Sequence, residues 1–524
     1  MEARRETPVG DTQDPHAAPG AWMGAQRWVR WAREHWLLPI MVLAALVRFY
    51  DLTAAAIWGD EGSSLLLSQH SLSEIWAHAA HDVHPPLYFM LLHGWIVWFG
   101  DGIFSIRALS ALPGIITVGL GVWLVDLLAT RRAALLAGIL LALLPTAVRY
   151  SQEVRMYSWL GLLLIGATIA LVYWVRQPRR NGYLVVYSLL MAAAFYTHYF
   201  TALCVISHWL WLAVVRVQPG YRLRHIQRPA WWLANLAIVL LYLPWVPNLT
   251  DLVQHMDALK ANGDVGWEDP VTLSSLPSMI WSLLTQDDGA TLPRWLFITL
   301  PVALLAVIGV ALARDRSVFR GSILLALFGV LPILLVFAVS FISPVFIERY
   351  LTAYALGLPM LVALAVDRLY SGFRVLALAI LVLFIGVELV GVNNNATVDP
   401  KDQVSVVVDY VNQHFVPGDQ IVTGDMLWYL VYVYYNRTGV KPLLYTPPLA
   451  NGASSRPNAY GFGTLVTSDA YVDSLGDLLN SGTRVWLIGL ADMPDEFATS
   501  LPADWHSVSE KKAGGVRARL FVRQ

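Results

Sequence analysis

Charged residues are scarce in this sequence of 524 amino acids. They make up 14% of the chain, against about 25% in ordinary soluble proteins, whereas 56% of the residues are hydrophobic and the mean hydropathy is +0.53. A soluble globule of this composition would expose large apolar patches, and a disordered chain needs low hydrophobicity and high net charge. The composition therefore predicts a polytopic membrane protein.

Cysteine and an excess of positive charge are also missing. Cys204 is the only cysteine, which excludes an intramolecular disulfide and a cysteine-based metal cluster. The net charge of −1 lacks the basic excess of a nucleic-acid-binding protein. We also find no internal repeat and no matched pair of interrupted helices, features that secondary transporters often show.

Three regions differ in composition. Residues 1–36 are polar and rich in Pro and Ala, which predicts a disordered cytoplasmic tail ending in an interfacial segment with Trp28, Arg30, Trp31 and Arg33. Residues 37–392 contain the long apolar runs and form the expected transmembrane domain. Residues 393–524 carry more charge, and their strand patterns at 420–423 and 484–489 follow helical patterns at 405–414 and 471–480. This alternation predicts a small C-terminal α/β domain.

The apolar runs predict about eleven to thirteen membrane-spanning helices, since a span needs about 20 apolar residues. The candidates are 37–57, 103–129, 133–149, 156–175, 183–197, 200–216, 230–247, 293–313, 321–342, 350–368 and 374–392. The run 85–99 is short and is expected to lie in the interface or to re-enter. Arginine-rich loops alternate with less basic ones, so the positive-inside rule predicts a cytoplasmic N-terminus and an extracytoplasmic C-terminal domain.

The first polar cluster on the predicted outer face is Asp60-Glu61, directly after the first span. Adjacent carboxylates at a membrane surface suit a general base beside a hydrogen-bond acceptor or metal ligand. The structural alternative is a helix N-terminus, with Asp60 as its cap and Glu61 at the positive end of the helix. Both interpretations stay open at this point.

Histidines and aromatic residues mark two further outer segments. His84 lies before Pro85-Pro86, which predicts a helix start that holds the imidazole at the membrane surface. His81, Asp82 and His84 also form a weak metal-binding pattern. Tyr196 to Tyr199, which includes His198, is a short polar turn between two spans.

Arginines on the wrong side of the membrane are a further signal, because they oppose the positive-inside bias and suit an anion. They are Arg107, Arg149, Arg155 and Arg349. Arginines grouped near a bilayer match a phosphate. For Arg155, a structural network with Glu153 is the alternative.

The outer loop 248–292 offers aromatic residues beside carboxylates, namely Trp267, Trp281, Asp287 and Asp288. Such a pairing suits sugar rings and hydroxyls, although tryptophan at an interface more often anchors a protein in the membrane.

Four motifs in order resemble the GT-C glycosyltransferases, and more narrowly the family 39, protein-mannosyltransferase-like enzymes. They are W-x-D-E at 58–61, D-x-H-P-P-L-Y at 82–88, S-Q-E-x-R-M-Y at 151–157 and E-R-Y at 348–350. The resemblance covers roughly residues 37–370. It implies a membrane glycosyltransferase that takes a sugar from a polyprenyl-phosphate donor and passes it to a glycan, lipid or protein acceptor outside the cytoplasm. A cell-membrane location is implied, and no nucleic acid.

The same resemblance implies roles for individual residues. Asp60 corresponds to the proposed base, with Glu61 as the second catalytic carboxylate, and His84, Arg107, Arg155 and Arg349 are expected to bind the donor phosphate. Glu153, Tyr157, His198, Glu348 and Tyr350 are expected to line the substrate site. No cofactor is required; a divalent cation is possible, held by Asp60, Glu153 and His84.

One departure concerns the aminoarabinose-transferase branch of the family. That branch has a lysine just before its proline where this sequence has Pro85. The resemblance then implies that phosphate binding rests on the arginines, and it disfavours a lipid A acceptor. A transporter or flippase of a lipid-linked saccharide is the main rival function, and a non-catalytic membrane scaffold is a second.

Overall fold

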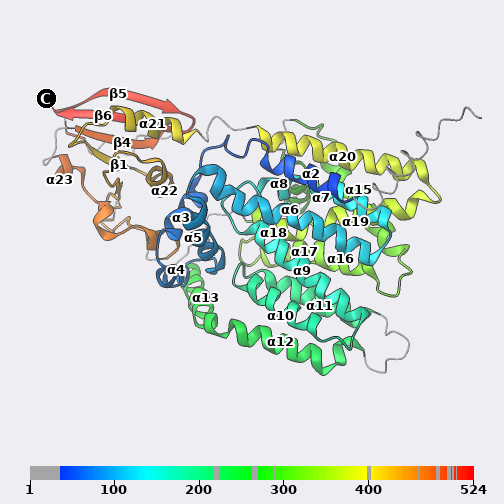
Figure 1. Ribbon diagram of the computed structural model, residues 1–524. Coiled ribbons are helices and arrows are strands. Elements are labelled where there is room, and N and C mark those ends of the chain that lie inside the picture. The colour runs from blue at the N-terminus through cyan, green and yellow to red at the C-terminus, as the bar shows by residue number, and fades with distance from the viewer. Residues whose placement is uncertain are drawn as a thin grey trace, which may run out of the picture.

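The structure is a computed structural model. It describes residues 36–215, 224–261, 270–287, 291–397, 403–449, 451–457, 460–479, 484–491, 497, 501–502 and 504–523. The tail with Trp28, Arg30, Trp31 and Arg33 lies outside the described residues, as do Trp267 and Asp288. Figure 1 shows a body of long helices with a small sheet domain beside one end of it. Three shorter helices lie between the two: α3 (Gly59–Ser68), α4 (Leu72–Ala79) and α5 (Leu87–Phe99).

Among the residues that the structure describes, seven helical segments of the body are long and apolar enough to cross a membrane. They are α6 (Ile103–Leu128), α9 (Tyr157–Arg176), the segment Pro229–Leu259 that contains α12 (Pro229–Tyr242) and most of α13 (Val246–Ala261), α15 (Leu296–Ala313), the segment Gly321–Val339 made of α16 (Gly321–Gly329) and α17 (Leu331–Val339), the segment Glu348–Tyr370 made of α18 (Glu348–Ala355) and α19 (Gly357–Tyr370), and α20 (Arg374–Ala396). Four shorter apolar helices accompany them: α2 (Leu38–Phe49), α5 (Leu87–Phe99), α10 (Gly182–Phe195) and α11 (Thr201–Val214).

A helix occupies each of the spans that the sequence predicts. The predicted span 133–149 is divided into α7 (Arg131–Leu143) and α8 (Pro145–Arg149), because Pro145 cannot continue the hydrogen bonding of α7. The short run 85–99 forms the 13-residue helix α5. The predicted polytopic helical membrane fold is confirmed.

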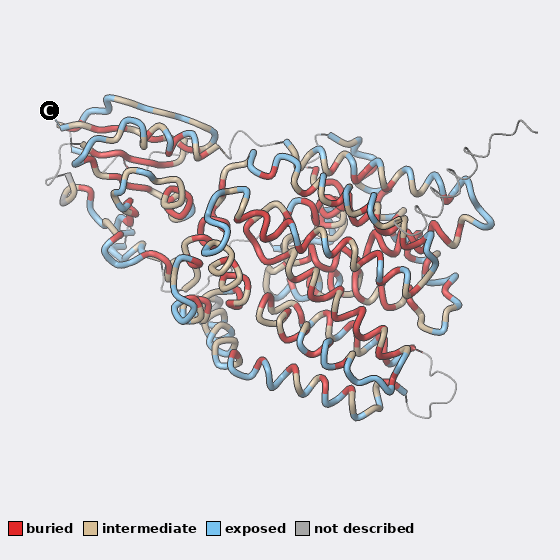
Figure 2. Tube along the Cα trace, in the orientation of Figure 1, coloured by how far each residue is buried: buried red, intermediate tan, exposed pale blue. Residues whose placement is uncertain are grey.

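The centre of the body is the segment formed by α18 and α19, which is almost wholly buried, whereas α12 and α20 present most of their surface outward (Figure 2). Gly329, the last residue of α16, packs directly against Gly357, the first residue of α19 in this buried segment. A Cβ atom on Gly357 would come within 2.6 Å of the Cα of Gly329, so only glycine allows this approach. The buried segment begins with Glu348, Arg349 and Tyr350, which are half-buried where the segment enters the body.

The C-terminal domain contains a mixed six-stranded sheet of order β3-β2-β1-β4-β6-β5. The strands are β1 (Gln420–Thr423), β2 (Leu443–Tyr445), β3 (Tyr471–Val472), β4 (Arg484–Leu490), β5 (Trp505–Ala513) and β6 (Val516–Arg523). The first four pair in parallel, and β6 pairs antiparallel with β4 and β5. Two helices of this domain precede β2 in the chain. They are α21 (Val404–His414), which comes before β1, and α22 (Met426–Tyr435), which follows it.

The predicted α/β character of this domain is confirmed, but one of its predicted helices is wrong in part. The segment 471–480 begins with strand β3, and a helix, α23 (Leu475–Leu479), forms only afterwards. Tyr471 and Val472 pair with Leu444 and Tyr445 of β2, and such aromatic and β-branched residues favour strands when a partner edge is present.

Candidate active site

The first outer loop leads into α3 (Gly59–Ser68), which carries Asp60 and Glu61 in its first turn. The helix begins two residues earlier than the N-cap interpretation expects, with Trp58 rather than Asp60 as its N-cap. Glu61, rather than Asp60, accepts the hydrogen bond from the Trp58 backbone N–H, at 3.3 Å. The structural interpretation is therefore realised by Glu61, and it leaves the Asp60 side chain available for another role.

Glu61 forms a buried ion pair with Arg107 of α6. Nε and Nη2 of Arg107 donate to the two carboxylate oxygens of Glu61, at 3.0 and 2.8 Å. Nη1 and Nη2 of Arg107 also donate to the backbone carbonyls of Leu52, Ala55 and Ala56. All five N–H donors of Arg107 are used within the protein. The backbone N–H of Val154 also donates to the Glu61 carboxylate.

This geometry changes two of the expected roles. Arg107 has no donor left for a phosphate, so its expected part in donor binding is replaced by holding the first outer loop against α6. Glu61 is fully buried and accepts four hydrogen bonds, so we no longer assign it a catalytic role. The sequence could not distinguish the two adjacent carboxylates, because their difference arises from the partner that each one faces.

Asp60 faces two arginines from distant parts of the chain. Its Oδ2 lies 3.8 Å from Nη2 of Arg155 and 3.9 Å from Nη2 of Arg349. Both distances exceed that of a direct hydrogen bond. Nη1 of Arg155 donates to the Asp60 carbonyl and to Oγ of Ser64, which fixes the guanidinium beside α3. Two guanidinium groups thus lie near one carboxylate without forming a direct hydrogen bond to its Oδ2.

His84 borders the same cluster and is oriented by its own loop. Its backbone N–H donates to Oδ1 of Asp82 at 2.9 Å, and its Nδ1 lies 3.3 Å from the same oxygen. Nε2 lies 3.5 Å from Nη2 of Arg155, an arrangement that suits Nδ1–H donating to Asp82 and Nε2 accepting. Burial lowers the pKa of His84 despite the raising effect of Asp82, and Arg155 lowers it further. The ring is therefore neutral near pH 7.

Aromatic rings close the cluster on its inner side. The ring of Tyr350 lies 5.1 Å from that of His198, 6.1 Å from His84 and 6.5 Å from Tyr157. His198 is buried; its Nδ1 accepts from the backbone N–H of Phe200, and its Nε2 has no hydrogen-bond partner in the described part of the chain. Burial lowers the pKa of His198 well below its ordinary value, so this ring is neutral too. Asp60, His84, Arg155, Tyr157, His198, Arg349 and Tyr350 are thus brought together as expected.

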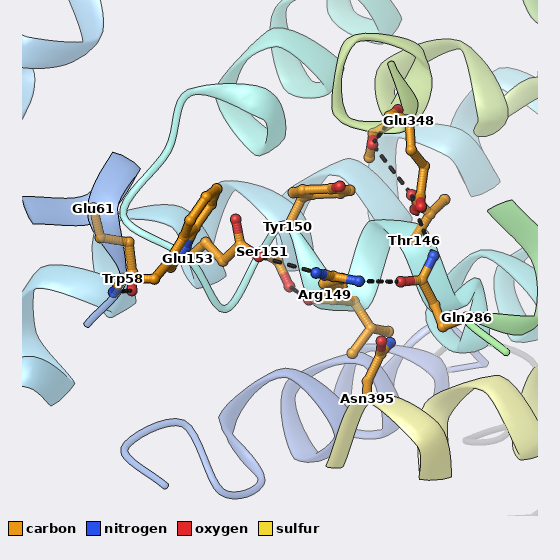
Figure 3. Close-up of polar contacts among 12 residues, drawn as sticks. Trp58, Glu61, Thr146, Arg149, Tyr150, Ser151, Glu153, Gln286, Glu348 and Asn395 are labelled. Atoms are coloured by element: carbon orange, nitrogen blue, oxygen red, sulfur yellow. Dashed lines mark hydrogen bonds and ion pairs between the residues drawn. The ribbon is translucent and has the colours of Figure 1, made fainter. Parts of the chain in front are cut away.

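Glu153 turns to the other side of its loop. Its Oε1 lies 3.5 Å from Nε of Arg149, which donates through Nη1 to Gln286 at 3.0 Å (Figure 3). Oε2 of Glu153 is buried and has no hydrogen-bond partner among the described residues. Burial raises the pKa of Glu153 to about 7; Arg149 opposes the rise, while Glu61 and Asp60 add to it. The alternative of a Glu153–Arg155 side-chain network is therefore replaced by a Glu153–Arg149 pair.

The expected cation ligands do not form a ligand set. Within the described ranges, no group of three or more His, Cys, Asp and Glu side chains is arranged to hold a metal ion. Glu153 faces Arg149, and Nε2 of His84 faces Arg155, so these two side chains and Asp60 do not converge.

Glu348 is also occupied within the protein. Its carboxylate accepts hydrogen bonds from Thr146 of α8 at 2.9 Å, from Gln286, and from Ser282 of α14 (Ser275–Thr285) (Figure 3). The expected role in substrate binding is replaced by a structural one, because these bonds fix the start of α18 and so position the neighbouring Arg349.

In the described part of the outer loop 248–292, Trp281 and Asp287 are engaged within the protein. Trp281 is buried in the helical core, and its Nε1 donates to the Asp287 carbonyl. The Asp287 carboxylate accepts from the backbone and side chain of Thr291. These two residues therefore stabilise the fold, and Trp281 is neither a sugar platform nor a membrane anchor.

The C-terminal domain supports α3 through direct contacts that the sequence does not reveal. α22 packs on α3, and a Cβ atom on Gly62 would lie 3.0 Å from the backbone carbonyl of Leu430. The Tyr435 hydroxyl accepts the backbone N–H of Ile57 at 2.8 Å. The two glycines that flank Asp60-Glu61 were the available signal, since glycine often marks a close approach of two backbones.

Comparison with known proteins agrees with this fold. Residues 83–247, about a third of the chain, match the family model described as dolichyl-phosphate-mannose-protein mannosyltransferase. No curated protein matches the chain in sequence.

Solved structures match over most of the length. ArnT from Cupriavidus metallidurans in the apo state is 14% identical with a TM-score of 0.61, and the match covers 93% of this chain and 98% of that one. The same protein bound to undecaprenyl phosphate gives 14% identity and 0.60, with the same coverage. The archaeal oligosaccharyltransferase AglB from Archaeoglobus fulgidus, in complex with an inhibitory peptide and a dolichol-phosphate, gives 13% and 0.53, covering 87% of this chain and 70% of that one. The chain thus has the GT-C glycosyltransferase fold that its motifs resemble, and residues 83–247 carry the protein-mannosyltransferase family pattern.

Proposed function

We propose that the protein is a membrane glycosyltransferase that moves a sugar from a polyprenyl-phosphate donor to an acceptor hydroxyl on the extracytoplasmic face. The observation that carries this proposal is the group formed by Asp60, Arg155 and Arg349, in which two cations surround one carboxylate at distances of 3.8 and 3.9 Å. The undecaprenyl phosphate bound by ArnT and the dolichol-phosphate bound by AglB support a lipid-phosphate ligand for this fold.

The reaction is a single displacement. Asp60 takes the proton from the acceptor hydroxyl, the hydroxyl oxygen forms a bond to the anomeric carbon, and the bond from that carbon to the phosphate oxygen breaks. Inversion follows, because no second carboxylate acts as a nucleophile. The leaving polyprenyl phosphate gains negative charge, and Arg155 and Arg349 are placed to stabilise it, an effect worth about 3 kcal/mol for each well-placed donor.

The surroundings of the cluster fit this division of labour. Arg155 is buried, so its charge is screened little by water, and Ser64 and the Asp60 carbonyl hold it in place. Neutral His84 accepts from Arg155 through Nε2 and adds no competing positive charge. We propose Tyr157, His198 and Tyr350 as the residues that border the donor sugar.

The test uses purified protein in vesicles, with a panel of polyprenyl-phosphate sugars and release of polyprenyl phosphate as the readout. We expect Arg155→Gln and Arg349→Gln each to lower kcat/KM by about 100-fold. Arg132→Gln is the matched control. Arg132 lies at the N-terminal end of α7, where it pairs with Asp367, and the variant should keep wild-type transfer. Lipid movement across vesicles without turnover of any donor would contradict the proposal and favour the transporter.

A further inference from the structure

A cavity lies beside the first outer loop, and its lining includes Trp58 and Glu61, the residue next to Asp60. Its volume is about 630 Å³, within the range of small-molecule sites of about 300–1,000 Å³. It is bounded by the C-terminal end of α2 and the segment after it, by the loop that follows α8, and by the last turn of α20. The buried Glu61–Arg107 pair forms part of its wall, so the cavity adjoins the residue next to Asp60.

Two buried polar atoms in this lining have no partner. Nε1 of Trp58 is a donor, Oε2 of Glu153 is an acceptor when ionised, and neither has a hydrogen-bond partner in the ranges that the structure describes. Buried polar groups without a partner are costly, and a ligand that supplies both an acceptor and a donor would relieve both. Figure 3 shows Trp58, Glu61 and Glu153 on one side of this region and Gln286 and Asn395 on the other, with Arg149 between them.

The charges of the lining argue against a phosphate. Arg107 is ion-paired with Glu61, and Arg149 with Glu153, so each cation is matched by a carboxylate of the same lining. Asp51 adds a further negative charge. A site for the donor phosphate needs surplus positive charge, which stands at Arg155 and Arg349 instead.

The remaining lining has the composition of a carbohydrate site. The rings of Tyr50 and Trp58 offer apolar faces. The side-chain amides of Gln152, Gln286 and Asn395 already donate within the protein. The indole N–H of Trp58 and Oε2 of Glu153 are therefore the buried polar groups that the described lining leaves for a ligand. Sugar hydroxyls both donate and accept, so neighbouring hydroxyls can satisfy an indole N–H and a carboxyl group together. A peptide would present backbone amides but few such paired hydroxyls.

We propose that this cavity is the acceptor site and that it binds an uncharged oligosaccharide through Trp58 and Glu153. The inference rests on the proposed function, since it names the acceptor class of the same transferase. The acceptor would then approach Asp60 from one side of the loop 150–156, and the donor phosphate would lie on the other side with Arg155.

The test measures occupancy of the cavity without requiring turnover. Cys204 is fully buried, so Ala396→Cys places a single reactive thiol in the lining, and Ala453→Cys provides an exposed control on the C-terminal domain. The rate of alkylation by a hydrophilic maleimide is measured with methyl disaccharides, with polyprenyl phosphate or with a Ser/Thr-containing peptide. At a disaccharide concentration about ten times its Kd, the Ala396→Cys thiol should react about tenfold more slowly, and the Ala453→Cys thiol should be unaffected.

The outcomes separate this inference from the proposed function. Protection by disaccharides that Trp58→Phe or Glu153→Gln abolishes would support the acceptor site, even if no donor in the panel were turned over. Protection by polyprenyl phosphate alone, or by the peptide alone, would overturn it. Absence of protection by every disaccharide in a variant that still transfers sugar would also overturn it while leaving the proposed function intact.

Discussion

The Glu61–Arg107 pair makes the most quantitative prediction, and Glu61→Gln is the perturbation that tests it. The Glu61 carboxylate accepts four N–H donors: two from Arg107 at 3.0 and 2.8 Å, one from the Val154 backbone at 2.9 Å and one from the Trp58 backbone at 3.3 Å. A glutamine has one acceptor oxygen, so its NH2 group would face two of these donors. Arg107 would meanwhile lose its buried counter-charge.

Breaking a buried ion pair by removing one partner costs about 3–5 kcal/mol. The side chain of Glu61 is fully buried and that of Arg107 is 4% exposed, so water can replace neither. The double variant Glu61→Gln/Arg107→Met removes the uncompensated cation as well. Its free energy of unfolding should fall by less than the sum of the two single changes, with a coupling of up to about 3 kcal/mol.

Thermal unfolding in detergent and donor turnover are measured together for these variants. Asp473→Asn is the control, since its ion pair with Arg456 is about 40% exposed and should contribute no more than about 1 kcal/mol. We expect Glu61→Gln to lower the Tm and the folded yield, with the turnover of the remaining folded protein reduced less than in Asp60→Asn. A Glu61→Gln protein with the wild-type Tm but no turnover would show that Glu61 is catalytic and that our assignment is wrong.

Three further predictions concern neighbouring groups. Burial raises the pKa of Glu153 from 4.5 to about 7, so the folded state binds this proton more tightly than the unfolded state. The protein should therefore lose at most about 3 kcal/mol of stability as pH rises from about 4.5 to 7. Glu153→Gln should flatten this part of the plot of unfolding free energy against pH, and an unchanged slope would contradict the assignment. Tyr435→Phe removes the hydroxyl that accepts from the Ile57 N–H and should lower the free energy of unfolding by about 1 kcal/mol. Gly62→Ala drives a Cβ against the Leu430 backbone and should lower kcat more than Tyr435→Phe does. Wild-type kcat in both variants would contradict the role of α22 in holding α3. His84→Gln keeps an acceptor for Arg155 and should retain more donor affinity than His84→Ala, measured as KM for the donor, and the reverse order would refute the tautomer.

The sequence predicted the fold class because membrane spans are long and dominated by one property. The runs that become α6, α9 and α20 are apolar over 20 or more residues, and their periodicity needs no tertiary information. The segment 471–480 was harder, because Tyr471 and Val472 become a strand only through pairing with β2.

The sequence placed the charged residues of the candidate site on one predicted face, but it did not indicate which partner each of them contacts. Asp60, Arg155 and Arg349 stand out in sequence as charges on the face that the positive-inside rule predicts to be extracytoplasmic. Arg107 shares that signal, yet its five donors are used by Glu61 and three backbone carbonyls that only folding brings near. The support from Tyr435 was not predictable, because it crosses 378 residues of sequence to reach Ile57.

The central claim, that Asp60 is the general base, is tested most directly by single-turnover transfer in Asp60→Asn. The carboxamide keeps the size of the side chain but cannot take the acceptor proton. We predict that the rate of sugar transfer falls by about 10²–10⁴-fold, with the Tm close to that of the wild type and polyprenyl phosphate still bound through Arg155 and Arg349. Full transfer by Asp60→Asn at the wild-type rate would contradict the account.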